Sequence, residues 1–152
     1  AYANFSDVVA YFDWLGSQFS TDADRRTRLE AAGEAIHAQE AALVRAILQG
    51  TGNLRGLAEM PGVRLIAGEA VEGREGVVSL NLDGWDTGAL VDFLGARGIR
   101  THIRKADQYS GNVLRPLGRA DCLRISFCHY NTEAEVARLL AAMEEAIAAT
   151  PA

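Results

Sequence analysis

The clearest alternation of apolar and polar residues runs from Cys122 to Cys128, and it predicts a strand with one buried face. Arg124 falls on the polar face of this strand. Thr132 and Glu135 then have the spacing of a capping box, in which a hydroxyl and a carboxylate bind backbone N–H groups at a helix start. The apolar residues beyond the box recur at helical spacing: Val136, Leu139, Leu140, Met143 and Ile147. The pattern therefore predicts a strand that leads directly into an amphipathic helix.

Two further helices are predicted near the start of the chain. The apolar residues of 5–15 recur at helical spacing, and Gly16 ends that segment. Residues 21–24, Thr-Asp-Ala-Asp, offer a hydroxyl N-cap with acidic residues in the first turn, so we expect a long helix over about 22–49. At the usual rise per residue this helix would reach about 40 Å, which is long enough to bridge two domains. Gly50 and the glycines that follow it end the helix.

The order of elements in the rest of the chain predicts the fold class. A strand entered at 60–63, a strand at 77–82, a helix at 87–96 and a strand at 98–103 precede the strand and helix described above. This order predicts an α+β fold, with a small antiparallel or mixed sheet covered on one side by two helices. We expect a helical connecting segment over 1–57 and an α+β small domain over 58–152.

Composition and charge narrow the classes of partner. The chain has 152 residues, of which 49% are hydrophobic, and this content supports a real core. The net charge of −5, with no basic stripe, argues against nucleic acid or an anionic membrane as the main partner. The sequence shows no run of roughly eighteen uncharged apolar residues and no basic start followed by an apolar segment. A cytoplasmic protein is the simplest expectation.

A specific motif surrounds Arg124. Residues 124–126 have the sequence Arg-Ile-Ser, and residues 130–133 have the sequence Tyr-Asn-Thr-Glu just before the acidic amphipathic helix. This pattern closely resembles the end of the small domain in class V aminotransferases, the fold-type I pyridoxal-phosphate enzymes that include cysteine desulfurases and selenocysteine lyases. The resemblance implies that Arg124 binds the substrate carboxylate, since a guanidinium can hold a carboxylate through two parallel hydrogen bonds. The alternative is that Arg124 pairs with an acidic neighbour or points to solvent.

The resemblance continues upstream, more loosely. The matching pieces are Met-Pro-Gly-Val at 60–63, the strand at 77–82, the helix at 87–96 and the Gly-Ile turn into the strand at 98–103. The likeness thus spans nearly the whole chain. It implies that the chain is the C-terminal part of a fold-type I enzyme, with a large domain preceding Ala1, and a first residue other than methionine agrees with this.

The cofactor implied by the resemblance is pyridoxal phosphate, which such enzymes hold as a Schiff base on a lysine. Lys105 is the only lysine, and it does not lie in the family's cofactor-lysine context, so it is interpreted as a surface charge. We therefore expect no cofactor-binding residue in this chain and no activity from the chain alone. The complete enzyme is expected to contain the missing N-terminal large domain, to bind pyridoxal phosphate and to be a homodimer.

The loop before Arg124 bears on the type of reaction. In cysteine desulfurases a catalytic cysteine lies on this loop, whereas residues 105–115 contain no cysteine, and an ungapped match places Tyr109 near that position. The same match places Arg104 near a second arginine that the family uses close to the substrate. His102 and Tyr109 are further candidates for the substrate site, because a histidine titrates near neutral pH and a phenol can donate a proton. Both are also compatible with ordinary surface positions.

The two cysteines, Cys122 and Cys128, share one strand face but stand roughly 20 Å apart, too far for a disulfide. We expect both to be small buried hydrophobic residues, and we expect no metal site because no CxxC pair exists.

Two functions follow from the sequence. The first is the C-terminal domain of a pyridoxal-phosphate-dependent class V aminotransferase-like enzyme that acts on a small amino acid. Transamination, lyase, epimerase and desulfurase chemistry all share the carboxylate-binding arginine, so the sequence does not choose among them, although the missing loop cysteine disfavours the last. The second is a stand-alone α+β binding or dimerisation module without catalytic chemistry.

Overall fold

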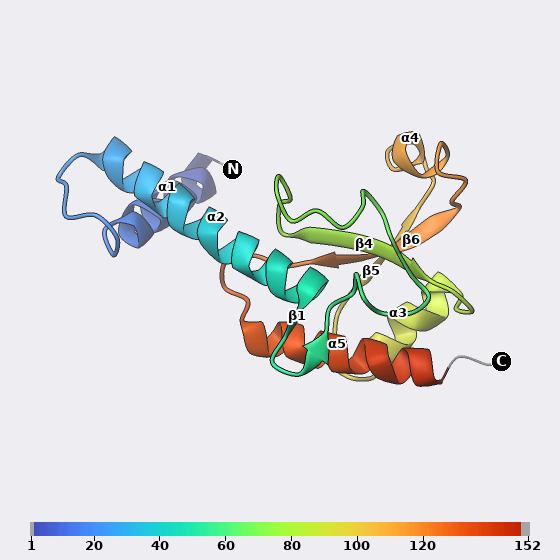
Figure 1. Cartoon of the computed structure of the whole chain (residues 1–152). Coiled ribbons are helices and arrows are strands. Elements are labelled where there is room, and N and C mark those ends of the chain that lie inside the picture. The colour runs from blue at the N-terminus through green and yellow to red at the C-terminus, as the bar shows by residue number, and fades with distance from the viewer. Residues whose placement is uncertain (1, 150–152) are drawn as a thin grey trace. The chain divides into compact units, whose positions relative to one another are not determined.

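The computed structural model describes residues 2–149, with side chains from residue 4 onward. The chain forms two compact units, residues 1–40 and residues 41–152, which divide within helix α2 (Arg25–Gln49). Figure 1 shows the elements of each unit. The long helix expected over about 22–49 is present as α2.

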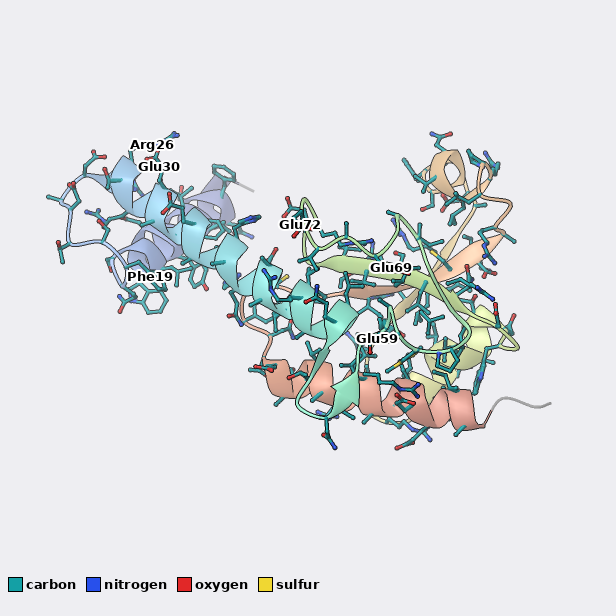
Figure 2. All side chains as sticks on the ribbon, viewed as in Figure 1. Phe19, Arg26, Glu30, Glu59, Glu69 and Glu72 are labelled. Atoms are coloured by element: carbon teal, nitrogen blue, oxygen red, sulfur yellow. The ribbon has the colours of Figure 1, made fainter. Side chains whose placement is uncertain are left out.

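The first unit consists of helix α1 (Tyr2–Gly16) and the beginning of α2. The two helices meet closely, since a Cβ atom on Gly16 would lie 1.8 Å from the carbonyl oxygen of Arg28. The Arg28 Nε donates to Asp13 over 2.6 Å, and this hydrogen bond lowers the pKa of the Asp13 carboxyl. Figure 2 shows Arg26 and Glu30 together on the exposed face of α2, where their side chains form an ion pair of 2.6 Å.

The N-cap of α2 corrects one prediction. Thr21 was expected to cap this helix, but α2 begins at Arg25 and the cap is Asp24, whose Oδ2 accepts from the Thr27 N–H over 2.9 Å. An ionised carboxylate at this position meets both the free N–H groups and the positive end of the helix dipole. The hydrogen bonds that the Asp24 carboxylate accepts from the N–H and the hydroxyl of Thr27 lower the pKa of Asp24.

The second unit contains a four-stranded sheet in the order β3-β4-β6-β5, in which every neighbouring pair is antiparallel. Its strands are β3 (Val63–Leu65), β4 (Val77–Leu82), β5 (His102–Lys105) and β6 (Asp121–Ser126). The helices of this unit are α3 (Thr87–Gly95), the short α4 (Gly111–Leu114) and α5 (Glu133–Ala148). The predicted α+β class and element order are therefore confirmed, and the sheet is antiparallel rather than mixed.

One face of the sheet is apolar and forms the core with α3, α5 and the last turns of α2. Figure 1 shows α3 and α5 on the same side of the sheet. The buried side chains come from all of these elements and include Ile47, Val78, Leu80, Leu90, Leu94, Leu123, Ile125, Leu139, Leu140 and Met143. The alternation predicted for 122–128 accounts for this arrangement, because Leu123, Ile125 and Phe127 are all buried.

The turn from β6 into α5 is stabilised as the sequence predicts. The Thr132 side chain accepts from the Glu135 N–H, and the Glu135 carboxylate accepts from the Thr132 N–H over 2.8 Å. The backbone hydrogen bond from Thr132 is the largest cause of the lowered pKa of Glu135. This capping box fixes where the chain turns after the strand that carries Arg124.

The Gly-Ile turn expected before the third strand is present. The Ile99 N–H donates to the Leu94 carbonyl and Gly98 has a φ of +73°, so this turn closes the end of α3, and β5 begins at His102. A small hairpin of β1 (Gly50–Thr51) and β2 (Leu54–Arg55) follows α2 where only a helix end was predicted.

Candidate functional site

The second face of the sheet carries the candidate site, because the strand register places polar residues there side by side. Arg124 on β6 lies between Ser79 on β4 and His102 on β5, its direct partners in the two neighbouring pairs. Arg104 lies opposite Cys122, one step further along the same face. Because side chains alternate across a strand, all of these residues project from the face opposite the core.

A hollow of about 300 Å³ lies over this face, beneath the segment that joins β5 to β6. Figure 1 shows α4, which belongs to that segment, on the side of the sheet away from α3 and α5. The hollow is lined by Ile66, Ser79, Arg104, Tyr109, Ser110, Val113, Leu114, Cys122 and Arg124. The fold thus brings together three of the four residues predicted for the substrate site, namely Arg124, Arg104 and Tyr109. His102, the fourth, is exposed beside Arg124 and does not line the hollow.

The guanidinium of Arg124 has a buried hydrogen-bond donor that is not used. Its Nε atom is buried and has no hydrogen-bond partner among the described residues. Within residues 2–149, neither Arg124 nor Arg104 has a carboxylate oxygen within 4.0 Å, whereas other arginines of the same unit, such as Arg55 and Arg97, form ion pairs of 2.7 and 2.8 Å. The acidic neighbour considered as an alternative partner of Arg124 is therefore not found in this part of the chain. The Arg124 side chain is half-buried, and a buried donor that lacks an acceptor is costly, so a bound anion would relieve that cost.

The thiol in the hollow is poorly suited to attack a substrate. Burial raises the pKa of Cys122, and a hydrogen bond with Ser79 opposes this only in part. Cys122 is buried, as predicted, but Cys128 is only half-buried, because it lies past the end of β6 on the turn toward α5. Both cysteines are free thiols.

This difference between the cysteines leads to a prediction about their reactivity. In the folded chain at mildly alkaline pH, iodoacetamide should alkylate Cys122 at least about tenfold more slowly than Cys128, because the reactive species is an accessible thiolate. Mass spectrometry of time points would measure both rates, with the single variants Cys122→Ser and Cys128→Ser to assign them. In denaturant the two rates should become similar. A faster reaction at Cys122 than at Cys128 in the folded chain would contradict the buried, high-pKa thiol.

Some residues of the hollow were missed by sequence reasoning. Ser79 could have been found, since it lies between the apolar residues Val78 and Leu80 on β4 and must face the polar side. Ser110 and Val113 carry no such signal, because the loop that presents them has no periodic pattern.

Within residues 2–149, no helix is long and apolar enough to cross a membrane. In the same part of the chain, no group of three or more His, Cys, Asp or Glu residues is arranged to hold a metal ion.

The helix-backed antiparallel sheet and its arginine-lined open face define an α+β domain with a cationic hollow. Residues 29–139 match the family described as aminotransferase class-V, and this match covers more than half of the chain. The chain therefore belongs to the class-V aminotransferase family, which confirms the resemblance noted from the residues around Arg124. No curated protein matches the chain significantly.

Solved structures of similar fold include cysteine desulfurases. The apo cysteine desulfurase from Thermococcus onnurineus NA1 is 27% identical with a TM-score of 0.67, over 82% of this chain and 29% of that chain. The cysteine desulfurase CsdA from Escherichia coli, in an S-sulfonic acid form, is 22% identical with a TM-score of 0.59, over 82% of this chain and 30% of that chain. A NifS-like protein from Rickettsia africae ESF-5 is 15% identical with a TM-score of 0.59, over 82% of this chain and 33% of that chain. The chain thus spans about a third or less of each relative, and the last two show the fold alone.

Proposed function

We propose that this chain is the part of a pyridoxal-phosphate-dependent, class V aminotransferase-like enzyme that binds the carboxylate of a small amino-acid substrate. Arg124 is the proposed carboxylate-binding residue. The observation that carries the proposal is the buried Nε of Arg124, which has no partner among residues 2–149 and belongs to a side chain that lines a hollow. A carboxylate offers the planar pair of acceptors that a guanidinium binds through two parallel hydrogen bonds.

Arg104 supports the same proposal as a second cation. It lines the hollow with Arg124 and, in the described part of the chain, forms no ion pair within 4.0 Å. Among the described residues that line the hollow there are two arginines and no carboxylate, which favours a ligand with an anionic group, and Asp107 near Arg104 is turned to backbone N–H groups of the loop. Tyr109 and Ser110 add hydroxyl groups that can donate hydrogen bonds to the same ligand.

The cofactor would be held by residues other than those of the hollow. Lys105 is the only lysine of the sequence, and it is exposed at the end of β5 opposite Asp121 and does not line the hollow. The residues of the hollow therefore do not fit a covalent anchor for pyridoxal phosphate. In the proposed enzyme it supplies the electron sink, and this chain supplies the orientation of the substrate.

Among the possible reactions, persulfide chemistry of the desulfurase type has the least support. Residues 105–115 include no cysteine, and the nearest thiol of the hollow, Cys122, is buried with a raised pKa. The 27% identity with a cysteine desulfurase covers only 29% of that enzyme, so it does not decide the reaction. We propose transaminase, lyase or epimerase chemistry in preference to desulfuration.

The test is the visible spectrum of the protein expressed from its full reading frame, titrated with amino acids. We expect the absorption of bound pyridoxal phosphate, and we expect L-alanine to perturb it far more than L-alaninamide, which lacks the carboxylate. The variant Arg124→Gln should bind the cofactor but lose this distinction. A colourless protein that takes up no pyridoxal phosphate, or an equal response to the acid and the amide, would reject the proposal and favour a binding module.

A further inference from the structure

The segment between β5 and β6 is held in a closed conformation by hydrogen bonds between its own residues. At its start, the Asp107 carboxylate accepts from the N–H groups of Tyr109 over 2.9 Å and of Ser110 over 2.8 Å. The Asp107 carbonyl accepts from the Gly111 N–H over 3.0 Å. These bonds lower the pKa of the Asp107 carboxyl, with smaller contributions from the charges of Arg104 and Arg115, so it is ionised at neutral pH.

Arg115 closes the segment from its other end. Its Nη2 donates to the carbonyl of Ala106 over 3.0 Å and to the carbonyl of Asp107 over 3.3 Å. The guanidinium lies against Gly111, where a Cβ atom would be only 2.6 Å from its Cζ. Gly111 therefore leaves the space that Arg115 needs to reach back across the loop. In addition, the Ala106 N–H donates to the Ala120 carbonyl over 2.8 Å, which joins the two ends of the segment.

The closed segment presents particular side chains to the hollow. Ser110 stands at the N-cap position of α4 but makes no capping hydrogen bond with its side chain, so its hydroxyl is not used for the helix. Ser110 and Val113 line the hollow together with Arg124, and Leu114, which also lines it, is buried and anchors the segment. The hollow thus has two arginines on the sheet side, and on the loop side it has the hydroxyl-bearing residues Tyr109 and Ser110 with the aliphatic residues Val113 and Leu114.

We propose that Asp107 and Arg115 are positioning residues that hold 106–115 as a fixed wall, so that Ser110 and Val113 select small amino-acid side chains without a positive charge. The proposal rests on the proposed function, because the wall selects among ligands whose carboxylate is bound by Arg124. Cationic side chains are disfavoured by Arg104 and by the lack of any carboxylate in the lining. Large side chains would have to displace a wall that is tied at both ends.

The first experiment tests the wall without any ligand. Amide hydrogen exchange of the chain should be on the order of tenfold faster at Tyr109, Ser110 and Gly111 in the variants Asp107→Ala and Arg115→Lys, since each variant loses hydrogen bonds that hold the loop. Asp107→Asn keeps an acceptor oxygen and should restore much of the protection. The matched control is Asp86→Ala, which removes the equivalent carboxylate from the start of α3, where it accepts from Ala89, and should leave 106–115 unchanged. Unchanged exchange in both loop variants would overturn the positioning role.

The second experiment tests selection in the protein expressed from its full reading frame. The test compares kcat/KM for L-alanine with kcat/KM for L-serine, L-valine and L-lysine. The ratios between these substrates should change in Ser110→Ala and in Val113→Ala. Asp107→Ala should reduce the ratios by on the order of tenfold. The Asp107→Ala effect should appear mainly in KM, and Asp107→Asn should largely restore it. If amide exchange in 106–115 is faster in Asp107→Ala but the kcat/KM ratios are unaltered, the proposed selection of substrates by the wall is wrong.

The two experiments separate the two proposals. If no amino acid is turned over or perturbs the protein, the proposed function and the selection built on it both fail, while the exchange data still decide whether Asp107 and Arg115 hold the loop. If amino acids respond through Arg124 but the ratios are insensitive to Ser110 and Val113, only the wall is rejected.

Discussion

Replacing Arg124 with alanine in the protein expressed from its full reading frame is expected to lower kcat/KM for its amino-acid substrate. The expected loss corresponds to about 2–4 kcal/mol of transition-state stabilisation. The physical reason is that a carboxylate brought into the hollow would lose its charge-assisted hydrogen bonds while still leaving water. The effect should include a higher KM and a lower kcat, because the arginine would both bind the substrate and orient it. Steady-state kinetics of the purified variant would measure both quantities.

The controls for this prediction separate charge from geometry. Arg124→Lys keeps the charge but offers no planar pair of donors, so it should recover only a part of the loss. Arg45→Ala removes an exposed arginine of the same compact unit that does not line the hollow, and it should leave kcat/KM unchanged. Kinetics close to those of the unchanged protein in a folded Arg124→Ala variant would remove Arg124 from the substrate site.

The second large effect is expected on stability, directly behind the site. Leu123→Ala should lower the free energy of unfolding by about 2–5 kcal/mol, because a fully buried side chain is removed and the core fills the space only partly. Leu123 has no exposed surface and lies opposite Leu80, which is equally buried, in the pairing of β6 with β4. Urea unfolding of the chain, followed by circular dichroism, would measure the change.

A matched control for that prediction lies on β4. Val77 belongs to the same sheet but keeps 42% of its surface exposed, so Val77→Ala should cost less than about 1 kcal/mol. Similar losses for Leu123→Ala and Val77→Ala would show that the core does not lie on the face assigned to it.

Local patterns in the sequence account for the elements around the site. The alternation over 122–128 predicts both the strand and its buried face, because side chains of a strand point to opposite sides whatever the partner strands are. Thr132 and Glu135 predict the start of α5 for a similar reason, since both capping hydrogen bonds close within one turn of backbone. The motif around Arg124 likewise indicates the family that the comparisons show.

One element that contacts a distant part of the chain was missed, and the cap of one helix was assigned to the wrong residue. The β1–β2 hairpin has only two residues in each strand, and Arg55 is tied to Glu144 of α5 by an ion pair that sequence spacing does not reveal. The cap of α2 was assigned to Thr21, although Asp24 was an equally good candidate by residue type.

The sequence by itself determined the strand and helix types, the apolar face of β6 and the family, because each follows from short-range geometry or from a contiguous motif. Only the tertiary structure decided that Arg124, Arg104 and Tyr109 share one hollow while His102 lies outside its lining. That grouping depends on the register of β5 and β6 and on a loop folded back by Asp107 and Arg115. Strand register pairs residues far apart in the chain, and the loop closes through contacts of Asp107 and Arg115 that follow no periodic pattern of amino acids.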